Sequence, residues 1–285
     1  MEMNRRQFVG SLALASLAAS LAGAAAAAAA ADGPKVRVGG RTGTFGGKWE
    51  AAKKAGLDGV EIGVGGAADK LSITNPDWQK RTKDDVEKAG LVVSSLSMDL
   101  LNSNPLATDE LPPAWVEQTI AACAALGAGA ILVPFFGKAH MLAGKEWKPE
   151  ITTLVERLRK LAPVAKDAGV KLGLECTLSG KQFNEILDRV DSEWVGAYYD
   201  IGNSTGAGLV PADDIKTIGA RIAMVHFKDG GNFLGEGKVD IQAAADALKA
   251  VDYRGWIILE TSCPTGNGEA DCTKNTAAVR RVMGI

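Results

Sequence analysis

Lys171-Leu-Gly-Leu-Glu175 is the first of four short apolar runs, each of which ends in an acidic or imidazole side chain. The other three are Val195-Gly-Ala-Tyr-Tyr-Asp200, Ile222-Ala-Met-Val-His226 and Trp256-Ile-Ile-Leu-Glu260. Their last residues are 25, 26 and 34 positions apart, so each interval has room for one helix and the next strand. Parallel strands of a barrel bring their C-terminal ends to one face. We therefore expect the four end residues to lie together at that face.

The same alternation of strand-like and helical segments is found upstream of these runs. Four further strands are expected at 35–39, 59–63, 91–96 and 130–135, separated by helical segments that end at glycines. Strict alternation favours a parallel sheet. Eight such units in about 250 residues, without a linker, predict a single (β/α)₈ TIM barrel. The alternative is an open doubly wound sheet, but Gly39-Gly-Arg-Thr-Gly43 lacks the spacing of its phosphate-binding turn.

The N-terminal segment differs in composition from the rest and begins with Asn4-Arg5-Arg6-Gln7-Phe8-Val9, a twin-arginine start. A run rich in Ala, Leu and Ser follows, and it ends near Ala31 with the small residues typical of a cleavage site. We expect residues 1–31 to be a Tat-type signal peptide and residues 32–285 to form the barrel. The alternative is an uncleaved membrane anchor. The segment is long enough to span a bilayer, but its many alanines drive membrane insertion only weakly.

The signal predicts the Tat export machinery as a partner and a periplasmic or otherwise extracytoplasmic location. The chain has 32 Lys and Arg against 34 Asp and Glu, and no basic stretch indicates a nucleic-acid partner. No later segment is long and apolar enough to suggest a membrane span, so no stable membrane insertion is expected after cleavage.

Four cysteines occur in a chain that is expected in an oxidising compartment. Cys123 lies in an alanine-rich helical run and is interpreted as a small buried apolar residue. Cys263 and Cys272 flank a stretch rich in Pro, Gly and Asn after the last strand. Either a disulfide that closes this loop or two unpaired thiols fits the sequence.

Two glutamates, one aspartate and one histidine form an oxygen-rich ligand set that suits a divalent cation. Each of Glu175, Asp200, His226 and Glu260, taken alone, could instead cap a helix or make a structural hydrogen bond. The joint pattern is more specific, because all four end consecutive strands and one of only two histidines falls in this register. Three carboxylates and one imidazole favour Mn²⁺, Mg²⁺ or Co²⁺, and Zn²⁺ is also compatible.

Two motifs carry a resemblance to a known family. His226-Phe-Lys-Asp229 and the following Leu234-Gly-Glu-Gly-Lys-Val-Asp240 resemble the xylose-isomerase-like sugar isomerase and epimerase superfamily, and the resemblance extends over the whole barrel domain. It implies a TIM barrel in which the four strand-end residues bind one divalent cation. In ketose epimerases of the family the first and last metal-binding glutamates move the proton, which implies acid–base catalysis by Glu175 and Glu260.

The implied reaction is isomerisation or epimerisation of an unphosphorylated sugar or polyol derivative, through proton abstraction next to a carbonyl and an ene-diolate. Export argues against a phosphorylated metabolite as substrate. A lyase or glycoside-cleaving eliminase acting on keto-sugars could use the same metal site, and a non-catalytic sugar-binding protein is a further alternative. An AP-endonuclease-like nuclease of this fold would need more histidines for its multi-zinc site.

Five further residues are candidates for contact with a carbohydrate substrate: Glu61, His140, Asn203, Lys228 and Glu236. Asn203 stands three residues after the metal-binding aspartate, where ketose epimerases usually carry a histidine, and its amide cannot relay a proton at neutral pH. This departure disfavours simple ketose 3-epimerisation and leaves room for a related reaction. Glu61 could instead cap a loop, and His140 could be a solvent-exposed loop residue. For Lys228 and Glu236 the alternative is a surface charge.

Overall fold

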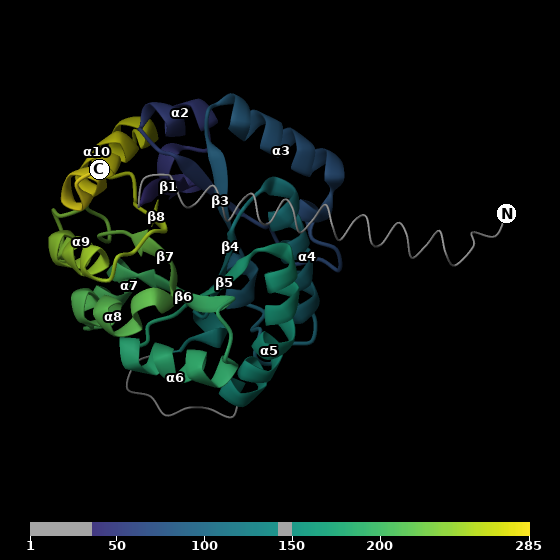
Figure 1. Ribbon diagram of the computed structural model, residues 1–285. Coiled ribbons are helices and arrows are strands. Elements are labelled where there is room, and N and C mark those ends of the chain that lie inside the picture. Colours follow the sequence, from purple (N-terminus) through teal and green to yellow (C-terminus); the bar gives the residue numbers. More distant parts are fainter. Residues whose placement is uncertain (1–35, 142–149) are drawn as a thin grey trace.

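A computed structural model of the protein describes residues 36–141 and 150–285, which form a closed barrel of parallel strands (Figure 1). The strands follow one another around the barrel in sequence order, and β1 pairs with β8 to close it. Their bounds are β1 (Arg37–Arg41), β2 (Gly59–Gly63), β3 (Val92–Ser97), β4 (Ala130–Pro134), β5 (Lys171–Glu175), β6 (Val195–Asp200), β7 (Ile222–Phe227) and β8 (Trp256–Leu259). The predicted single (β/α)₈ TIM barrel is confirmed.

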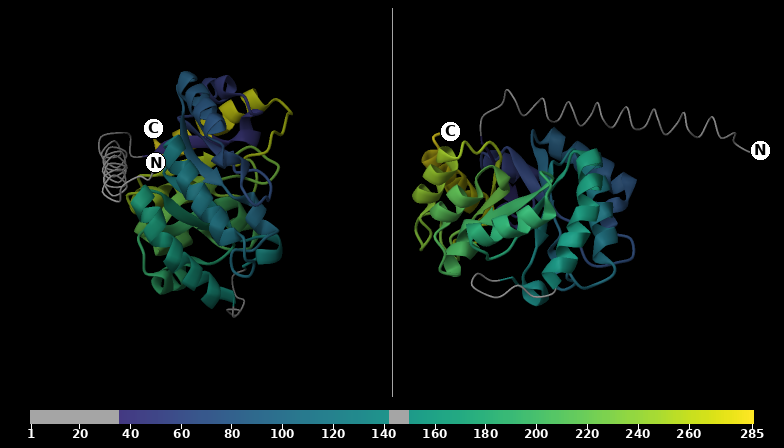
Figure 2. Two further views of the ribbon diagram at one scale, coloured as in Figure 1. Left: turned by 90° about the vertical axis from the view of Figure 1, so that its right-hand side faces the viewer. Right: turned by 60° about the horizontal axis from the view of Figure 1, so that its bottom comes forward.

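The helices surround the barrel (Figure 1) and pack apolar side chains against the outer faces of the strands, and Figure 2 shows the molecule from two further directions. The helices are α2 (Trp49–Lys54), α3 (Pro76–Lys88), α4 (Pro112–Leu126), α5 (Glu150–Ala168), α6 (Gly180–Val190), α7 (Ile201–Gly206), α8 (Pro211–Ile218), α9 (Ile241–Ala250) and α10 (Gly268–Met283). Within the two described ranges, no helix has the length and apolar character needed to cross a membrane. The predicted signal peptide lies outside these ranges.

Short 3₁₀ turns follow several strands or precede the next element. They are η1 (Thr42–Phe45), η2 (Ser72–Thr74), η3 (Asp99–Asn102), η4 (Gly137–Ala139) and η5 (Gly219–Arg221). The connection from β6 to β7 differs from the sequence-based expectation, because it holds two helices, α7 and α8, where one was predicted. The extra helix α7 begins directly after Asp200, whose Oδ1 accepts a hydrogen bond of 2.7 Å from the backbone N–H of Asn203. Asp200 therefore caps α7 with one oxygen and leaves Oδ2 for other partners.

The interior of the barrel is filled by inward-facing side chains in layers. Side chains on a strand alternate between its two faces, so residues two apart point the same way. One interior cluster consists of Ala130, Leu132, Tyr198, Met224, Trp256 and Ile258. Asp200, His226 and Glu260 each stand two residues after a member of this cluster, which makes them the next inward positions toward the C-terminal face. On β5 the corresponding position below Glu175 is Gly173, where a Cβ atom would lie only 3.0 Å from Cβ of Tyr198.

The thiols of the chain are all unpaired in the structure, which agrees with the second of the two interpretations of Cys263 and Cys272. Cys123 is fully buried, as expected for a small apolar residue. Burial raises the pKa of the Cys272 thiol to about 11. Sγ of Cys263 lies 3.6 Å from the carbonyl oxygen of Thr44.

The loop after β7 is organised by Asp229, which is 2% exposed. Its Oδ2 accepts hydrogen bonds from the backbone N–H groups of Gly235 (3.2 Å) and Gly237 (2.8 Å). Its Oδ1 accepts from those of Lys238 (2.9 Å) and Val239 (3.1 Å). Gly237 is required by this close approach, because a Cβ atom there would lie 2.2 Å from Oδ1. The aspartate and the Gly-Glu-Gly turn of the sequence motif thus form one structural unit.

An Asp229→Asn variant is expected to lose about 2–4 kcal/mol of the free energy of unfolding, because the amide nitrogen cannot accept hydrogen bonds from the backbone donors. Urea unfolding followed by far-UV circular dichroism measures this change. Asp246→Asn is the matched control on an exposed position of α9, where the same substitution should leave the unfolding midpoint unchanged. Equal midpoints for the two variants would show that Asp229 does not hold the loop.

Candidate metal centre

The four predicted ligands lie together at the C-terminal face of the barrel. One possible ligand atom from each of Glu175, Asp200, His226 and Glu260 lies within 4.8 Å of the others. Nδ1 of His226 is 3.3 Å from Glu175 Oε1, 3.3 Å from Glu260 Oε2 and 3.7 Å from Asp200 Oδ2. Three of the four side chains are buried, and Glu260, which follows the last residue of β8, is 23% exposed. The cluster can therefore hold a metal ion that is reached from the side of Glu260.

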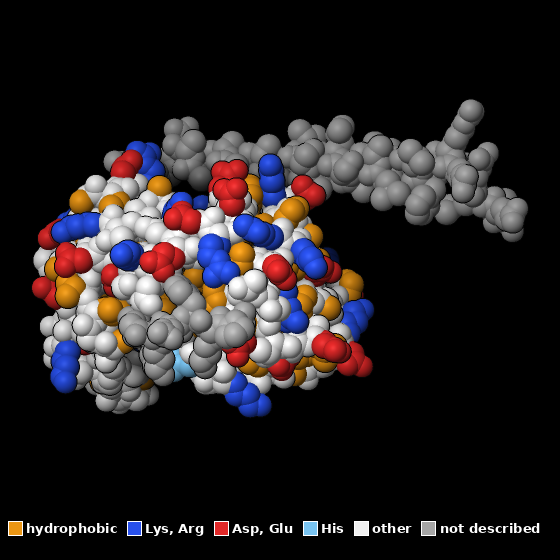
Figure 3. Space-filling model, turned by 90° about the horizontal axis from the view of Figure 1, so that it is seen from below, with side chains coloured by type: hydrophobic (Ala, Val, Ile, Leu, Met, Phe, Trp, Pro, Cys, Tyr) orange, Lys and Arg blue, Asp and Glu red, His pale blue; other side chains and the backbone are white. Residues whose placement is uncertain are grey.

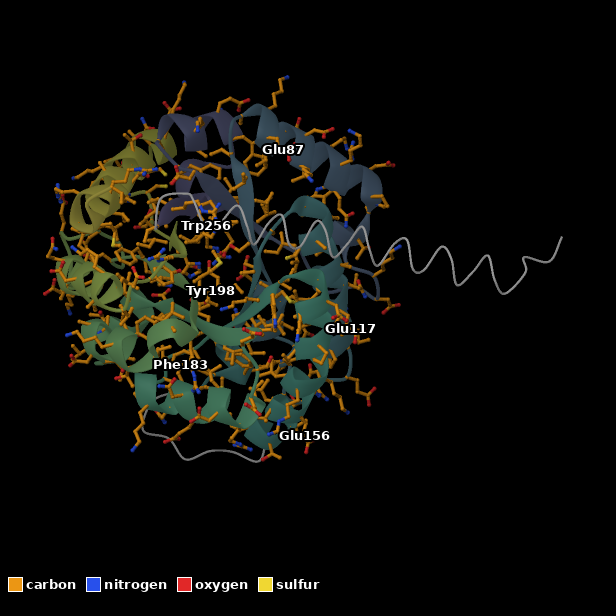
Figure 4. All side chains as sticks on the ribbon, in the orientation of Figure 1. Glu87, Glu117, Glu156, Phe183, Tyr198 and Trp256 are labelled. Atoms are coloured by element: carbon orange, nitrogen blue, oxygen red, sulfur yellow. The ribbon has the colours of Figure 1, made fainter. Side chains whose placement is uncertain are left out.

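The other ring nitrogen of His226 contacts Glu61, the middle residue of β2. Nε2 of His226 lies 3.3 Å from Glu61 Oε1, and the hydroxyls of Ser95 (2.8 Å) and Tyr198 (2.5 Å) donate to Glu61 Oε2. In Figure 4, Tyr198 lies near the centre of the ring of strands. A carboxylate that accepts from Nε2–H fixes the tautomer of the imidazole and directs Nδ1 toward the ligand cluster.

This position of Glu61 differs from the predicted contact with substrate. Glu61 is 1% exposed, and both of its oxygens are already engaged inside the barrel. Burial alone would raise its pKa, but His226, Arg41 and the hydroxyl of Tyr198 lower the pKa of Glu61 below its usual value. In the structure Glu61 is thus held inside the barrel by His226, Ser95 and Tyr198.

A Glu61→Gln variant is expected to bind a divalent cation about 10–100-fold more weakly, because glutamine removes the negative charge that orients and polarises the imidazole. Isothermal titration of the metal-free protein with Mn²⁺ measures the change. Glu117→Gln is the matched control, since Glu117 is exposed on α4 and lies on the outer ring in Figure 4. If both variants bind Mn²⁺ as the parent does, Glu61 has no role in supporting the ligand.

The two predicted acid–base glutamates lie in different electrostatic environments. Burial, together with the carboxylates of Asp200 and Glu260, raises the pKa of Glu175 to about 7 against the opposing effect of His226. For Glu260, burial is outweighed by His226, Lys228 and Arg41, which together lower its pKa below the usual range. A carboxyl group with a pKa near neutrality can both accept and return a proton at physiological pH. Of the two glutamates, Glu175 is therefore the more basic.

Lys228 lies within the candidate centre. Its Nζ is 2.8 Å from Asp200 Oδ2 and 2.6 Å from Glu260 Oε2, and its side chain is mostly buried. Burial alone would lower the pKa of Lys228, but Asp200, Glu260 and Glu175 raise it above its usual value. The ammonium group thus offsets part of the negative charge of the three carboxylates.

Asn203 and His140 lie close to the ligands. The amide Nδ2 of Asn203 donates to Glu175 Oε1 over 3.3 Å, which places Asn203 beside the candidate base. His140 is exposed on the loop after β4, and its Nε2 is 3.2 Å from the hydroxyl of Thr177, two residues after Glu175. Its ring also packs against Phe136, with ring centroids 5.7 Å apart. His140 therefore stands on the rim of the same face.

Glu236 is not directed toward the ligands, in contrast to the predicted substrate contact. Its carboxylate forms an ion pair of 2.7 Å with Lys274 on α10, and both side chains are more than half exposed. The reason is the Gly-Glu-Gly turn, whose backbone N–H groups face Asp229 while the intervening glutamate side chain faces outward to α10. Glu236 is thus a surface charge, which was the alternative interpretation.

Arg41, at the end of β1, belongs to the centre and was missed by sequence reasoning. Its guanidinium donates from Nη1 to Glu260 Oε1, and Nε lies 3.3 Å from Glu61 Oε1. Nη2 reaches Asp99 Oδ2 (2.5 Å) and the hydroxyl of Ser97 (3.2 Å). The sequence did contain a signal for Arg41. Arg41 stands at the end of the first strand, just as the four ligands stand at or within one residue of the ends of their strands. The glycines around Arg41 were compared only with a phosphate-binding turn, so the arginine itself was not considered.

Comparison with known proteins agrees with this architecture. The sequence profile of the xylose isomerase-like TIM barrel family matches residues 49–282. No curated protein matches the chain. Among solved structures, D-psicose 3-epimerase in the presence of D-fructose is similar with a TM-score of 0.73 and 16% identity, over 87% of this chain and 100% of the other.

Two further solved structures are similar at the same level. L-ribulose 3-epimerase has a TM-score of 0.73 at 20% identity and is covered to 95%, with 87% of this chain aligned. The 3-keto-D-glucoside 4-epimerase from E. coli has a TM-score of 0.67 at 18% identity and is covered to 99%, with 86% of this chain aligned. At these identities the structural likeness establishes a shared fold. Because the family profile matches most of its length, the chain belongs to the xylose isomerase-like TIM barrel family.

Proposed function

We propose that this protein is a divalent-metal-dependent isomerase or epimerase that acts on an unphosphorylated sugar or polyol derivative. The observation that carries the proposal is the convergence of three carboxylates and one imidazole at one face of the barrel, with the buried carboxylate of Glu175 among them. Such a group can remove a proton from a carbon next to a carbonyl at neutral pH. Sugar epimerases are also among the proteins that share the fold, which supports the same class of reaction.

The donor set fits a divalent cation. Carboxylate and imidazole donors suit Mn²⁺, Mg²⁺ and Co²⁺, and Zn²⁺ is compatible. Asp200 Oδ2 is buried and accepts no well-aligned hydrogen bond from the described residues, although Lys228 Nζ lies 2.8 Å away. Glu175, Asp200, His226 and Glu260 would hold the ion. When bound, the cation supplies positive charge that stabilises the oxygens of an ene-diolate.

The side chains have separate tasks in this proposal. Glu175 abstracts the proton, and the amide of Asn203 holds its Oε1 in place. Glu260 is the candidate for the second proton transfer, and its Oε2 is as close to His226 Nδ1 as Glu175 Oε1 is. His140 on the rim is the candidate for a hydrogen bond to a substrate hydroxyl. Lys228 lies close enough to the ligands to contact the same substrate oxygens.

The charge distribution supports an uncharged substrate. The two basic side chains of the centre are both committed to carboxylates: Arg41 contacts Glu260 and Asp99, and Lys228 contacts Glu260 and Asp200. The positive charge of both side chains is thus already offset within the centre, which disfavours a substrate that carries a phosphate or a carboxylate. On the face shown in Figure 3, Lys and Arg side chains are interspersed with Asp and Glu. A neutral carbohydrate fits these charges.

Elimination on a keto-sugar is a second candidate function, and the position of Asn203 favours it. An amide that donates to Glu175 can orient the base but cannot return a proton to the substrate. The same ene-diolate could then expel a leaving group from the neighbouring carbon. This lyase or eliminase reaction would use the same metal ligands and the same base.

One experiment distinguishes these functions. The protein, stripped of metal with EDTA and reloaded with Mn²⁺, is incubated in D₂O with ketoses, inososes and 3-keto-glycosides, and the products are followed by NMR. Deuterium at the carbon next to the carbonyl, without bond cleavage, supports isomerisation or epimerisation. Release of an aglycone identifies the eliminase. If the reloaded protein shows neither deuterium incorporation nor aglycone release with any of these substrates, the proposed enzymatic function would be refuted. A non-catalytic sugar-binding protein would then be the remaining hypothesis.

The twin-arginine start supports a further part of the proposal, in which the folded protein is exported and meets its substrate outside the cytoplasm. An extracytoplasmic location fits an unphosphorylated substrate. Replacing Arg5 and Arg6 with lysine should leave the protein in the cytoplasm, which cell fractionation measures. Unchanged export of that variant would show that the segment is not a Tat signal.

A further inference from the structure

We infer that Arg41 is a positioning residue that holds two metal ligands at once, Glu260 directly and His226 through Glu61. The inference rests on the proposed metal-dependent function. It concerns what fixes the ligands in place, which neither the family resemblance nor the shared fold supplies. Three observations carry the inference. They are the register of β1 with its neighbouring strands, the contacts made by the guanidinium nitrogens, and the different partners of the two Glu260 oxygens.

The strand register places Arg41 between the two residues that it joins. β1 pairs with β2 so that Arg41 lies opposite Glu61, and it pairs with β8 so that Gly40 lies opposite Leu259, the residue before Glu260. The two carboxylates therefore come from either side of β1: Glu61 lies on β2, and Glu260 directly follows β8. The contact does not depend on a mobile loop, because the backbone of Arg41 is part of the barrel sheet.

The guanidinium uses several of its donor positions in different directions. Nε faces Glu61, Nη1 faces Glu260, and Nη2 faces Asp99 and Ser97. A planar group with five N–H donors in a fixed fork can satisfy such a set, whereas the ammonium of lysine is a compact point charge. The Arg41 side chain is 22% exposed and that of Glu61 is fully buried, so this contact is largely shielded from water, whereas Asp99 is more than half exposed.

The oxygens of Glu260 are divided between two directions. Oε1 is held by Arg41, while Oε2 faces Lys228 Nζ at 2.6 Å and His226 Nδ1 at 3.3 Å. On the other side, Glu61 Oε1 is shared between Arg41 Nε and His226 Nε2, each at 3.3 Å. One guanidinium thus determines which oxygen Glu260 presents to the ligand cluster and also steadies the carboxylate that orients His226.

The test uses Arg41→Met and Arg41→Lys in the full barrel, with Mn²⁺ alone as the probe. Affinity is measured by isothermal titration, and the geometry of the bound ion is followed by its EPR spectrum. Arg41→Met should bind Mn²⁺ about 10–100-fold more weakly than the parent, with an altered spectrum. The Mn²⁺ affinity of Arg41→Lys should lie between those of the parent and Arg41→Met, because one ammonium group cannot contact both carboxylates as the guanidinium does. Arg254→Met is the matched control, since Arg254 forms an exposed ion pair with Asp252.

The outcomes separate this inference from the proposed function. If the parent and the control bind Mn²⁺ but Arg41→Met binds it with the same affinity and spectrum, Arg41 is not a positioning residue and the proposed function stands. If the parent binds no Mn²⁺, the metal-dependent function itself fails, and the inference fails with it. Should Arg41→Met fail to fold by circular dichroism, Arg41→Lys decides. Parent-like affinity and spectrum in that variant would overturn the requirement for the guanidinium fork.

Discussion

Replacing Glu175 with glutamine is expected to lower turnover by about 10²–10⁴-fold, the usual effect of losing a general acid or base. Glutamine keeps an oxygen at a similar position, so the variant should retain part of its metal. It has no group that can accept the substrate proton, whereas the pKa of Glu175 is raised to about 7 by its buried position. Deuterium exchange from D₂O into a substrate identified by the NMR panel measures the proton transfer directly.

Glu117→Gln provides the matched comparison for this variant, because it makes the same chemical change on an exposed residue of α4. Its exchange rate should equal that of the parent. A Glu260→Gln variant separates the two glutamates, since only the residue that removes the first proton is needed for exchange. Full exchange by Glu175→Gln would exclude Glu175 as the base.

His226→Ala is expected to lose most of its bound divalent cation and, with it, measurable turnover. The substitution removes Nδ1, the atom that faces all three carboxylates, and also leaves the buried charge of Glu61 without its imidazole partner. Glu61 keeps Arg41 as its cationic partner but loses one partner inside the barrel, so a lower melting temperature should accompany the loss of metal. Metal content after gel filtration, measured by mass spectrometry, provides the test.

The chain has one other histidine, which serves as the control for this prediction. His140→Ala changes a rim residue in contact with Thr177, and it should keep as much metal as the parent. Asp200→Ala should behave like His226→Ala, because it removes another donor of the same cluster. Parent-level metal in both the Asp200 and His226 variants would show that the ion binds elsewhere.

The fold and the candidate ligands could be predicted from the sequence because both depend on local periodicity. Alternation of strands and helices predicts a parallel barrel. Glu175 and Asp200 end their strands, His226 is the last residue but one of β7, and Glu260 directly follows β8. Strand ends of a parallel barrel share one face, so His226 and Glu175 could be placed together without any knowledge of their contacts. The predicted cluster needed only the correct strand boundaries.

The contacts around the ligands could not be predicted in the same way. Period two shows that Glu61 faces inward, but it does not show that Ser95 and Tyr198 occupy one of its oxygens, since these residues come from other strands. Arg41 likewise depends on which strands neighbour β1. Glu236 was misplaced because its motif was interpreted as functional, whereas the hydrogen bonds of Asp229 show that the turn is structural.

The layering inside the barrel has a consequence for how this protein could diverge or be redesigned. The candidate ligands and Glu61 stand on strands or directly after them, above the cluster that contains Tyr198 and Met224, while His140 stands on a loop. A change of specificity therefore needs no change in the reactive centre. Grafting the connection after β4, or the part of the connection after β8 that lies beyond Glu260, from a relative with another substrate should change selectivity while the candidate metal ligands are kept.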